Sequence, residues 1–216
     1  MMANVTPETP TPETPKLQTP RLLLRRWHKQ DREPFHRMNA DPHVMEFFPA
    51  CLTPQESDGL IDRIEAHMER HGFGFYAAEL RETGEFIGFV GMAWTPFEAH
   101  FTPCVEIGWR LGSAYWNRGL ATEGARECLR HGFEALELAE VVAMTVGANV
   151  RSRRVMEKLG MTCRPADTFE HPHVPAGHVL RQHVLYRILN ERVIQEKGIA
   201  NPSLPPSHVR GGHPGT

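Results

Sequence analysis

The sequence predicts a mixed α/β fold in which one sheet carries helices on both faces, and three observations support this. Hydrophobic residues make up 40% of the 216 residues and charged residues 23%, so the chain can bury a core. Segments of two-residue hydrophobic period alternate with segments of helical period. Strands that follow one another directly come first and β-α-β units come later, which together favour a mixed sheet.

Proline separates the two ends of the chain from its middle. Nine of the 18 prolines fall within residues 1–20 and 199–216, which hold few apolar residues. Such segments favour extended, polyproline-like conformations and cannot bury a core. We therefore expect a disordered Pro/Thr-rich arm over residues 1–17, one folded domain over 18–197 and a disordered tail over 198–216.

Local signals mark the first helices and strands of the domain. Asp31 is a helix cap, and Thr53 caps a second helix that has Pro54 at its first position. Gly72 follows the end of that helix, and residues 82–84 form a hairpin signal between two strands. The predicted elements, in order, are strand 21–27, helices 31–39 and 54–70, strands 75–81, 85–94 and 104–111, helix 120–136, strand 141–146, helix 149–159, and strands 161–166 and 179–189.

Composition excludes several classes of protein. Lys and Arg total 24 against 26 for Asp and Glu, so the chain is not a strongly basic nucleic-acid binder. The apolar run at 86–94 is too short to span a membrane, and the N-terminus lacks the pattern of a secretory signal. We therefore expect a cytoplasmic protein with no nucleic-acid or membrane partner.

Cysteine and histidine spacing does not indicate a metal site. The four cysteines contain no CxxC pair, so buried reduced thiols are the better interpretation. His67 and His71 lie four residues apart in a helical stretch, but no third ligand accompanies them. We interpret both histidines as surface residues and expect no metal.

The segment from Cys104 to Met161 contains the residues that indicate chemistry. In the strand CVEIGWRL, Glu106 alternates with apolar neighbours and would lie in or beside a cavity if the strand is central. Burial would raise the pKa of this carboxyl towards neutrality, as a general base requires. A purely structural glutamate, bound to a backbone group or an arginine, is an equally weighted alternative.

Two helix starts follow this strand. The turn YWNRGLATE runs into a helix whose free amides make an anion site, and Gly119 lets a phosphate approach the backbone. A nucleotide-binding loop would need Lys-Ser/Thr after the glycine, where Leu120 and Ala121 stand instead. Asn149 caps the next helix, and Ser152 shares its face. Either both residues only begin the helix, or the Asn149 amide and the Ser152 hydroxyl bind one ligand together.

These three pieces, in this order and at this spacing, resemble the GNAT superfamily of acetyl-CoA-dependent N-acetyltransferases. The motifs EIGWRL, YWNRGLATEG and ANxxSxxxMEKLGM, with the opening TPRLLLRRW, are similar to the branch of ribosomal-protein N-terminal acetyltransferases. The similarity covers nearly all of residues 18–190. One departure is Trp116, which stands where the superfamily's pyrophosphate loop usually has Gln or Arg.

The resemblance implies a GNAT-like fold with a central, mostly antiparallel sheet and helices on both faces. It implies acetyl-CoA as co-substrate and a protein N-terminus or a small-molecule amine as acceptor. Homodimers are frequent among such enzymes, but nothing in the sequence fixes the oligomeric state. The backbone of Ile107–Leu111 would pair with pantetheine, and Asn149 would bind near the thioester. The implied cofactor-binding residues are Ile107, Trp109, Leu111, Asn117, Arg118, Gly119, Leu120, Ala121, Thr122, Asn149 and Ser152.

The implied reaction is direct attack of a neutral amine on the acetyl carbonyl in a ternary complex. Ser152 matches a serine proposed to protonate the thiolate in this branch, and a strand-end amide near Trp109 or Arg110 would hold the oxyanion. Glu106 is the first candidate base. Glu170 is another, as are the histidines of the same region, His171, His173, His178 and His183. The alternative function is a non-catalytic acyl-CoA-binding or sensing module of the same fold.

Overall fold

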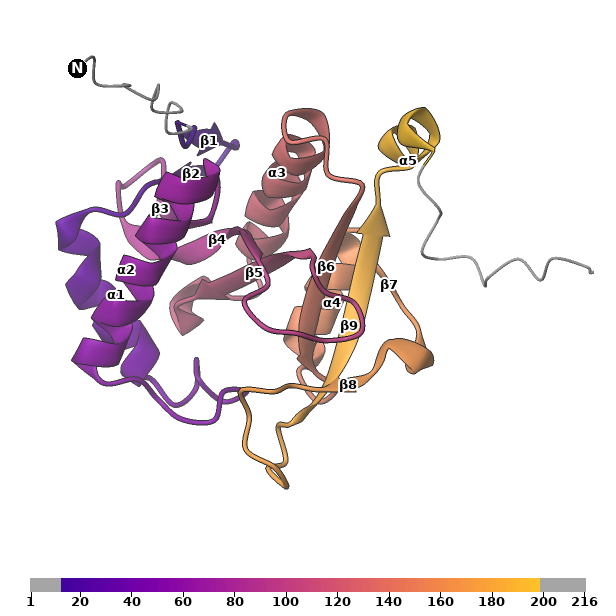
Figure 1. The fold of residues 1–216 in the computed structure, drawn as a ribbon. Helices are drawn as coiled ribbons and strands as arrows, with labels where there is room; N and C mark the ends of the chain where they lie inside the picture. The colour runs from indigo at the N-terminus through magenta and orange to yellow at the C-terminus, as the bar shows by residue number, and fades with distance from the viewer. Residues whose placement is uncertain (1–12, 199–216) are drawn as a thin grey trace, which may run out of the picture.

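The alternating apolar segments become neighbouring strands of one nine-stranded sheet (Figure 1). The computed structural model describes residues 13–198. The strands run in the order β1-β2-β3-β4-β5-β6-β9-β7, and β8 pairs with β9. Their bounds are β1 Leu17–Gln18, β2 Leu22–Arg25, β3 Phe75–Leu80, β4 Phe86–Trp94, β5 Val105–Leu111, β6 Glu140–Val146, β7 Thr162–Cys163, β8 Phe169–Glu170 and β9 Gln182–Leu189.

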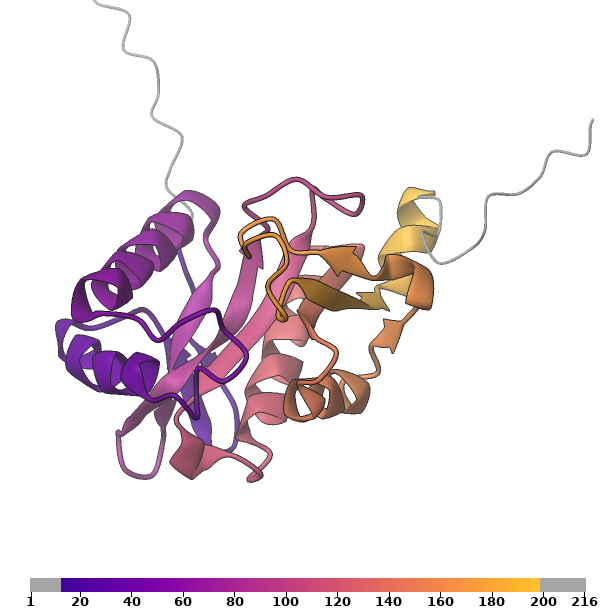
Figure 2. The same cartoon turned by 90° about the horizontal axis from the view of Figure 1, so that it is seen from below.

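Helices cover both faces of this sheet, as the sequence predicts. Helices α1 and α2 lie on one face, and α3 and α4 lie on the other (Figure 2). Each buries an apolar side against the strands, including Ile61 and Met68 from α2 and Leu120 and Leu129 from α3. The helices are α1 Arg32–Ala40, α2 Pro54–His71, α3 Leu120–Glu134, α4 Val150–Lys158 and α5 Glu191–Lys197.

The sheet is antiparallel everywhere except between the neighbouring strands β5 and β6. Strands β4 and β5 pair over seven registered residues, and so do β6 and β9. The parallel strands β5 and β6 share one registered pair, Glu106 opposite Val142. Beyond that pair the two strands separate towards their carboxyl ends, and α3 and α4 begin shortly after those ends. The separation is called the fork below.

Several local expectations need correction. The short strands β1 and β8 and the helix α5 were not predicted, the predicted strand 161–166 is only two residues long as β7, and the last strand begins at residue 182 instead of 179. Most of the predicted terminal arms lies outside the described residues. Leu17, placed in the N-terminal arm by the sequence, is buried and pairs with Leu24. His67, expected at the surface, is half-buried, and its ring bonds the backbone of Phe73 and Trp94. Cys51 and Cys163, expected to be buried, are exposed.

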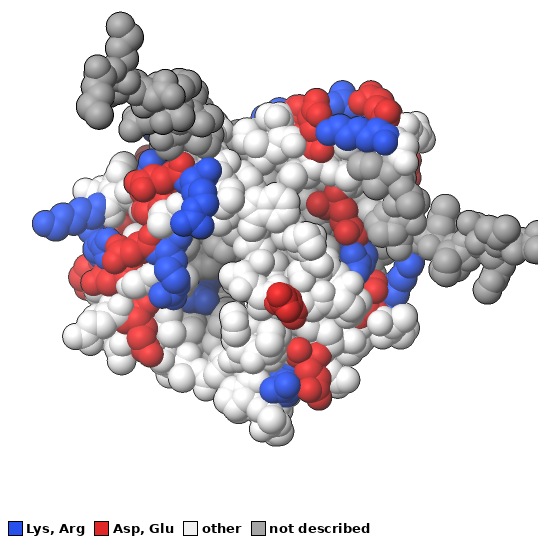
Figure 3. Space-filling view, viewed as in Figure 1, with Lys and Arg blue, Asp and Glu red and all other residues white. Residues whose placement is uncertain are grey.

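The surface carries charges of both signs. Figure 3 shows basic and acidic side chains interleaved over α1 and α2, where several form ion pairs such as Arg26 with Glu65 and Arg32 with Asp62. Within residues 13–198, no helix is both long and apolar enough to cross a membrane.

A buried ion pair joins β2 to the start of α1. Arg25 is 2% exposed and Asp31 is 1% exposed, and their closest contact, Nη1 to Oδ2, is 2.7 Å. Glu79 of β3 accepts from Arg25 Nε at 2.7 Å, and Asp31 also accepts from the backbone N–H of His28. Removing Asp31 would break this buried pair and leave the less buried Glu79 as the remaining carboxylate partner of Arg25.

We expect Asp31→Asn to lower the free energy of unfolding by about 3–5 kcal/mol, because Arg25 would lose its most buried counter-charge. Urea denaturation measures this loss. Glu33→Gln is the matched control, since Glu33 forms an exposed pair with Arg37 and such pairs contribute about 1 kcal/mol or less. A loss for Asp31→Asn no larger than that of the control would contradict this account of the pair.

Candidate active site

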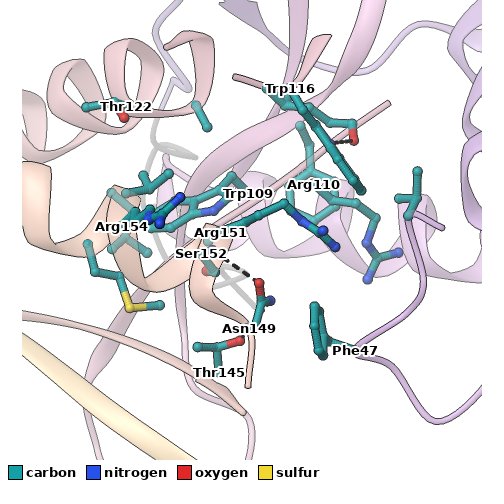
Figure 4. A pocket seen from close by; sticks show the side chains of 18 of the residues that line it. Phe47, Trp109, Arg110, Trp116, Thr122, Thr145, Asn149, Arg151, Ser152 and Arg154 are labelled. Carbon is teal, nitrogen blue, oxygen red and sulfur yellow. Dashed lines mark hydrogen bonds between the residues drawn. The ribbon is translucent and has the colours of Figure 1, made fainter. Parts of the chain in front are cut away.

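A cavity of about 520 Å³ opens at the fork. Both strands of the fork line it, together with the starts of α3 and α4, the segment between α1 and α2, and two histidines near β9. Figure 4 shows side chains from these separate elements directed into the same space. The lining residues used below are Phe47, Phe48, Phe75, Phe89, Glu106, Ile107, Gly108, Trp109, Arg110, Leu111, Trp116, Asn117, Gly119, Leu120, Ala121, Thr122, Met144, Thr145, Asn149, Arg151, Ser152, Arg154, Lys158, His171 and His183.

The turn before α3 has the backbone of an anion site. Asn117 has φ 59° and Gly119 has φ 78°, so both residues have a left-handed backbone conformation. The chain turns through these two residues into α3. The first N–H groups of α3 have no carbonyl partner within the helix and point from its positive end. A Cβ built on Gly119 would meet one heavy atom within 4 Å, Arg21 Nη2 at 3.6 Å, so the backbone here is not covered by neighbouring side chains at closer range.

Arg118 is the one predicted cofactor residue of this turn that does not line the cavity. Its guanidinium lies 5.9 Å from the ring centre of Tyr115, and its carbonyl accepts a hydrogen bond from Arg21. Cations on α4 line the cavity instead, namely Arg151, Arg154 and Lys158. Lys158 was not among the cofactor-binding residues expected from the sequence.

Asn149 and Ser152 meet as the sequence predicts. Asn149 Oδ1 accepts from the backbone N–H of Ser152 at 3.1 Å, so the side chain caps α4 (Figure 4). Its Nδ2 donates to Thr145 Oγ1 at 3.1 Å, which leaves the second amide hydrogen for a ligand. The Ser152 hydroxyl has no hydrogen-bond partner among residues 13–198 and also lines the cavity. The helix cap therefore fixes an amide and a hydroxyl on one wall.

Glu106 lies where the fork opens. Its side chain lines the cavity and has no hydrogen-bond or ion-pair partner among residues 13–198. Burial raises the pKa of the Glu106 carboxyl to about 7, because the charged form is poorly solvated there. Near neutral pH this carboxyl therefore interconverts between proton acceptor and proton donor.

The other candidate bases lie in different surroundings. Glu170 is exposed, pairs with Arg181 at 2.8 Å and does not line the cavity. His171 and His183 line the cavity, whereas His173 and His178 do not. Burial, with the neighbouring His183 and His173, lowers the pKa of His171 to about 4, and burial also lowers that of His183. Both rings are neutral at pH 7.

The segment between α1 and α2 covers the cavity on its other side. Phe47 and Phe48 line the cavity, and Glu46 forms an ion pair with Arg151 of α4. The Arg151 guanidinium lies 4.5 Å from the ring centre of Trp116 and 5.6 Å from that of Phe47. Phe47 and Phe48 stand next to each other between two predicted helices, and exposed aromatic side chains mark binding surfaces. This pair was the signal in the sequence that could have placed the segment at the site.

Comparison with known proteins identifies the domain. Residues 21–162 match the family model described as an acetyltransferase (GNAT) domain. The chain is 27% identical over 171 residues to the uncharacterized N-acetyltransferase YnaD of Bacillus subtilis, covering 79% of this chain and 94% of that protein. It is 33% identical over 146 residues to the FsC-acetyl coenzyme A-N(2)-transacetylase of Aspergillus fumigatus, covering 62% of this chain and 59% of that enzyme.

Solved structures agree with this result. An acetyltransferase of Agrobacterium tumefaciens superposes with a TM-score of 0.67 at 27% identity, covering 85% of this chain and 99% of that chain. The ribosomal L7/L12 alpha-N-protein acetyltransferase RimL, solved in complex with coenzyme A, superposes with a TM-score of 0.66 at 13% identity, covering 81% and 98%. The second likeness concerns the fold alone.

We expect Gly119→Val to weaken acetyl-CoA binding at least tenfold while the protein stays folded. A β-branched side chain would strain the left-handed backbone that directs the first amides of α3, so these amides would no longer hold the pyrophosphate in place. Isothermal titration calorimetry measures the affinity.

Gly84→Val is the matched control for this experiment. Gly84 has φ 72° and open space around it, but it lies in the β3–β4 hairpin and does not line the cavity. Both variants carry the same backbone strain, so only Gly119→Val should lose affinity. Equal affinities in the two folded variants would contradict the placement of the pyrophosphate at this turn.

Proposed function

Because this chain belongs to the GNAT acetyltransferase family, we propose that the cavity at the fork is where an acetyl group passes from acetyl-CoA to a primary amine. The predicted family, fold, co-substrate and acyltransferase activity are confirmed by the family match and the named relatives. Those relatives do not favour the non-catalytic alternative. The acceptor, a cytoplasmic location and a homodimer stay predictions.

In the proposed complex, acetyl-CoA enters from the side of α3 and α4. The amides that begin α3 hold the pyrophosphate, and Arg154 and Lys158 add positive charge for its phosphates. The pantetheine arm lies against the β5 backbone at Ile107–Leu111, where the strand lacks registered partners from β6. The second amide hydrogen of Asn149, which Thr145 does not use, bonds the pantetheine near the thioester.

The transfer then proceeds by direct attack. The neutral amine forms a C–N bond to the acetyl carbon, and the C–S bond breaks with its electron pair leaving on sulfur. The amine loses a proton to Glu106, and the thiolate takes a proton from Ser152, which is then reprotonated from solvent. A β5 amide near Trp109 or Arg110 stabilises the oxyanion between these steps.

The observation that carries this assignment is the environment of Glu106. It lines the cavity beside the fork, and its pKa of about 7 suits proton transfer at neutral pH. Glu170 is exposed and paired, and the two cavity histidines have lowered pKa values, so they are weaker candidates for the base.

We expect kcat/KM of the wild-type protein to rise with pH through about 7, because Glu106 must be deprotonated to accept a proton. In Glu106→Gln this acidic limb should vanish, with partial recovery at high pH where the amine is already neutral. Glu170→Gln is the matched control and should keep the limb. A limb that persists in Glu106→Gln would show that another group sets the profile.

A second readout of Glu106 does not depend on activity. Because its folded-state pKa is raised above the ordinary 4.5 to about 7, the folded protein binds more protons than the unfolded chain between these values. This contribution makes the free energy of unfolding fall as pH rises from about 4.5 to 7. Denaturation at several pH values should show a smaller fall in Glu106→Gln.

We expect Ser152→Ala to lower turnover by ~10²-fold, the lower end of a general-acid contribution, with acetyl-CoA affinity nearly intact. Steady-state kinetics with calorimetry separates the two effects. Ser113→Ala is the control, since Ser113 bonds Asp41 and does not line the cavity. Turnover in Ser152→Ala equal to that of the control would remove Ser152 from the mechanism.

A further inference from the structure

Two charged side chains without counter-charges stand on the same face of β5. Glu106, Gly108 and Arg110 alternate with Ile107 and Trp109, so the first three share one side of the strand. Glu106 and Arg110 both line the cavity, and the two are not within ion-pair distance of each other. Neither has an oppositely charged side chain as an ion-pair partner among residues 13–198.

Arg110 is held in place by neutral groups. Its Nη1 donates to Asn39 Oδ1 at 2.7 Å, and Asn39 in turn donates to Ser57 Oγ at 2.8 Å. The guanidinium lies 4.1 Å from the ring centre of Phe48 and 5.5 Å from that of Phe89. Its Nε is buried without a hydrogen-bond partner in the described structure. The group is therefore fixed in orientation while most of its five N–H donors stay unused.

Other arginines of low exposure in this protein are neutralised. Arg25 pairs with Asp31 and Glu79, and Arg187 pairs with Glu140 and Asp167. Burial alone would lower the pKa of these two arginines, but their carboxylate partners raise it. Burial lowers the pKa of Arg110 to about 10, so it stays charged at neutral pH without such a partner. A fixed, uncompensated guanidinium in a cavity is a binding site for a carboxylate.

The surface between the two charges suits a short aliphatic chain. Gly108 contributes no side chain, and a Cβ built there would lie 3.2 Å from the nearest ring atom of Phe75. Phe75 and Phe89 lie 5.2 Å apart and continue this apolar floor towards Arg110. The Cα atoms of residues 106 and 110 are about 13 Å apart along an extended strand, and both side chains can shorten that span.

We infer that the acceptor is a small amino carboxylate, bound with its amine at Glu106 and its carboxylate at Arg110. This inference rests on the proposed function, because it takes Glu106 as the place where the amine reacts. It narrows the acceptor from any primary amine to a molecule that carries both groups, separated by a few carbon atoms. Asn39, Phe48 and Phe89 then act as positioning residues for the guanidinium.

Matched acceptors test the inference. Acetyl transfer is measured as thiol release with ω-amino carboxylates from glycine to 6-aminohexanoate, and with unbranched alkylamines of the same carbon number. We expect the wild-type protein to prefer the best amino carboxylate over its matched alkylamine by about 10- to 100-fold in kcat/KM, the size of a charge-assisted hydrogen bond. In Arg110→Gln this ratio should fall towards one.

Variants separate recognition from a merely structural role. Arg110→Lys keeps the positive charge but loses the planar guanidinium, so it should keep part of the preference for amino carboxylates over alkylamines. Arg63→Gln, an exposed position on α2 outside the cavity lining, should keep the full ratio. An Arg110→Gln variant that loses activity equally on both acceptor classes would overturn the inference and assign Arg110 to packing.

The outcomes also distinguish this inference from the proposed function. A wild-type protein that acetylates alkylamines as well as amino carboxylates is an acetyltransferase but overturns the carboxylate site. A preference for peptides with a free N-terminus over every amino carboxylate would also overturn the carboxylate site while leaving the acetyltransferase assignment intact. A wild-type protein that binds acetyl-CoA and releases no thiol with any amine overturns the proposed function, and the acceptor assignment with it.

Discussion

The rest of the site depends on the separation of two parallel strands. Strands β5 and β6 share a single registered pair, Glu106 with Val142, whereas their outer neighbours pair with them over seven residues each. A parallel pair needs a crossover connection, and here α3 supplies it. The start of α3 and the start of α4 are thereby brought to the edge where the strands part. One geometric feature thus gives a free strand edge, two helix starts and a cavity.

The chemistry of the cavity follows from what is left unpaired there. Elsewhere the structure neutralises buried charge, as with Arg25 between Asp31 and Glu79. In the cavity, Glu106 and Arg110 have no oppositely charged partner within residues 13–198, Arg110 Nε has no hydrogen-bond partner there, and neither does the Ser152 hydroxyl. Unpaired polar groups cost stability, so their presence in one cavity is best explained by a ligand that pairs them.

Much of this arrangement could be predicted from the sequence because its signals are local. The cap at Asn149, the glycine before α3 and the alternation around Glu106 each depend on neighbouring residues, and the structure has all three in place. The roles of these residues in binding acetyl-CoA and in the reaction were taken from the family resemblance. The catalytic roles assigned to Glu106, Ser152 and Glu170 stay predictions. Of these three residues, Glu106 and Ser152 line the cavity and Glu170 does not.

Features that depend on contacts distant in sequence were not predicted. Strands β1 and β8 are two residues long and exist only because β2 and β9 offer them an edge. Arg110 reads as an ordinary strand residue until Asn39 and Phe48, some 60 to 70 positions earlier, are seen against it. The segment with Phe47 carries no regular period, so its place over the cavity follows from tertiary packing alone.

A crystal structure of the protein with coenzyme A tests the central claim most directly. The account places the pyrophosphate at the amides of residues 119–122 and the pantetheine arm against β5 at residues 107–111, with the sulfur in the fork. Coenzyme A bound elsewhere, or a fork closed by continuous pairing of residues 107–111 with 143–146, would contradict it.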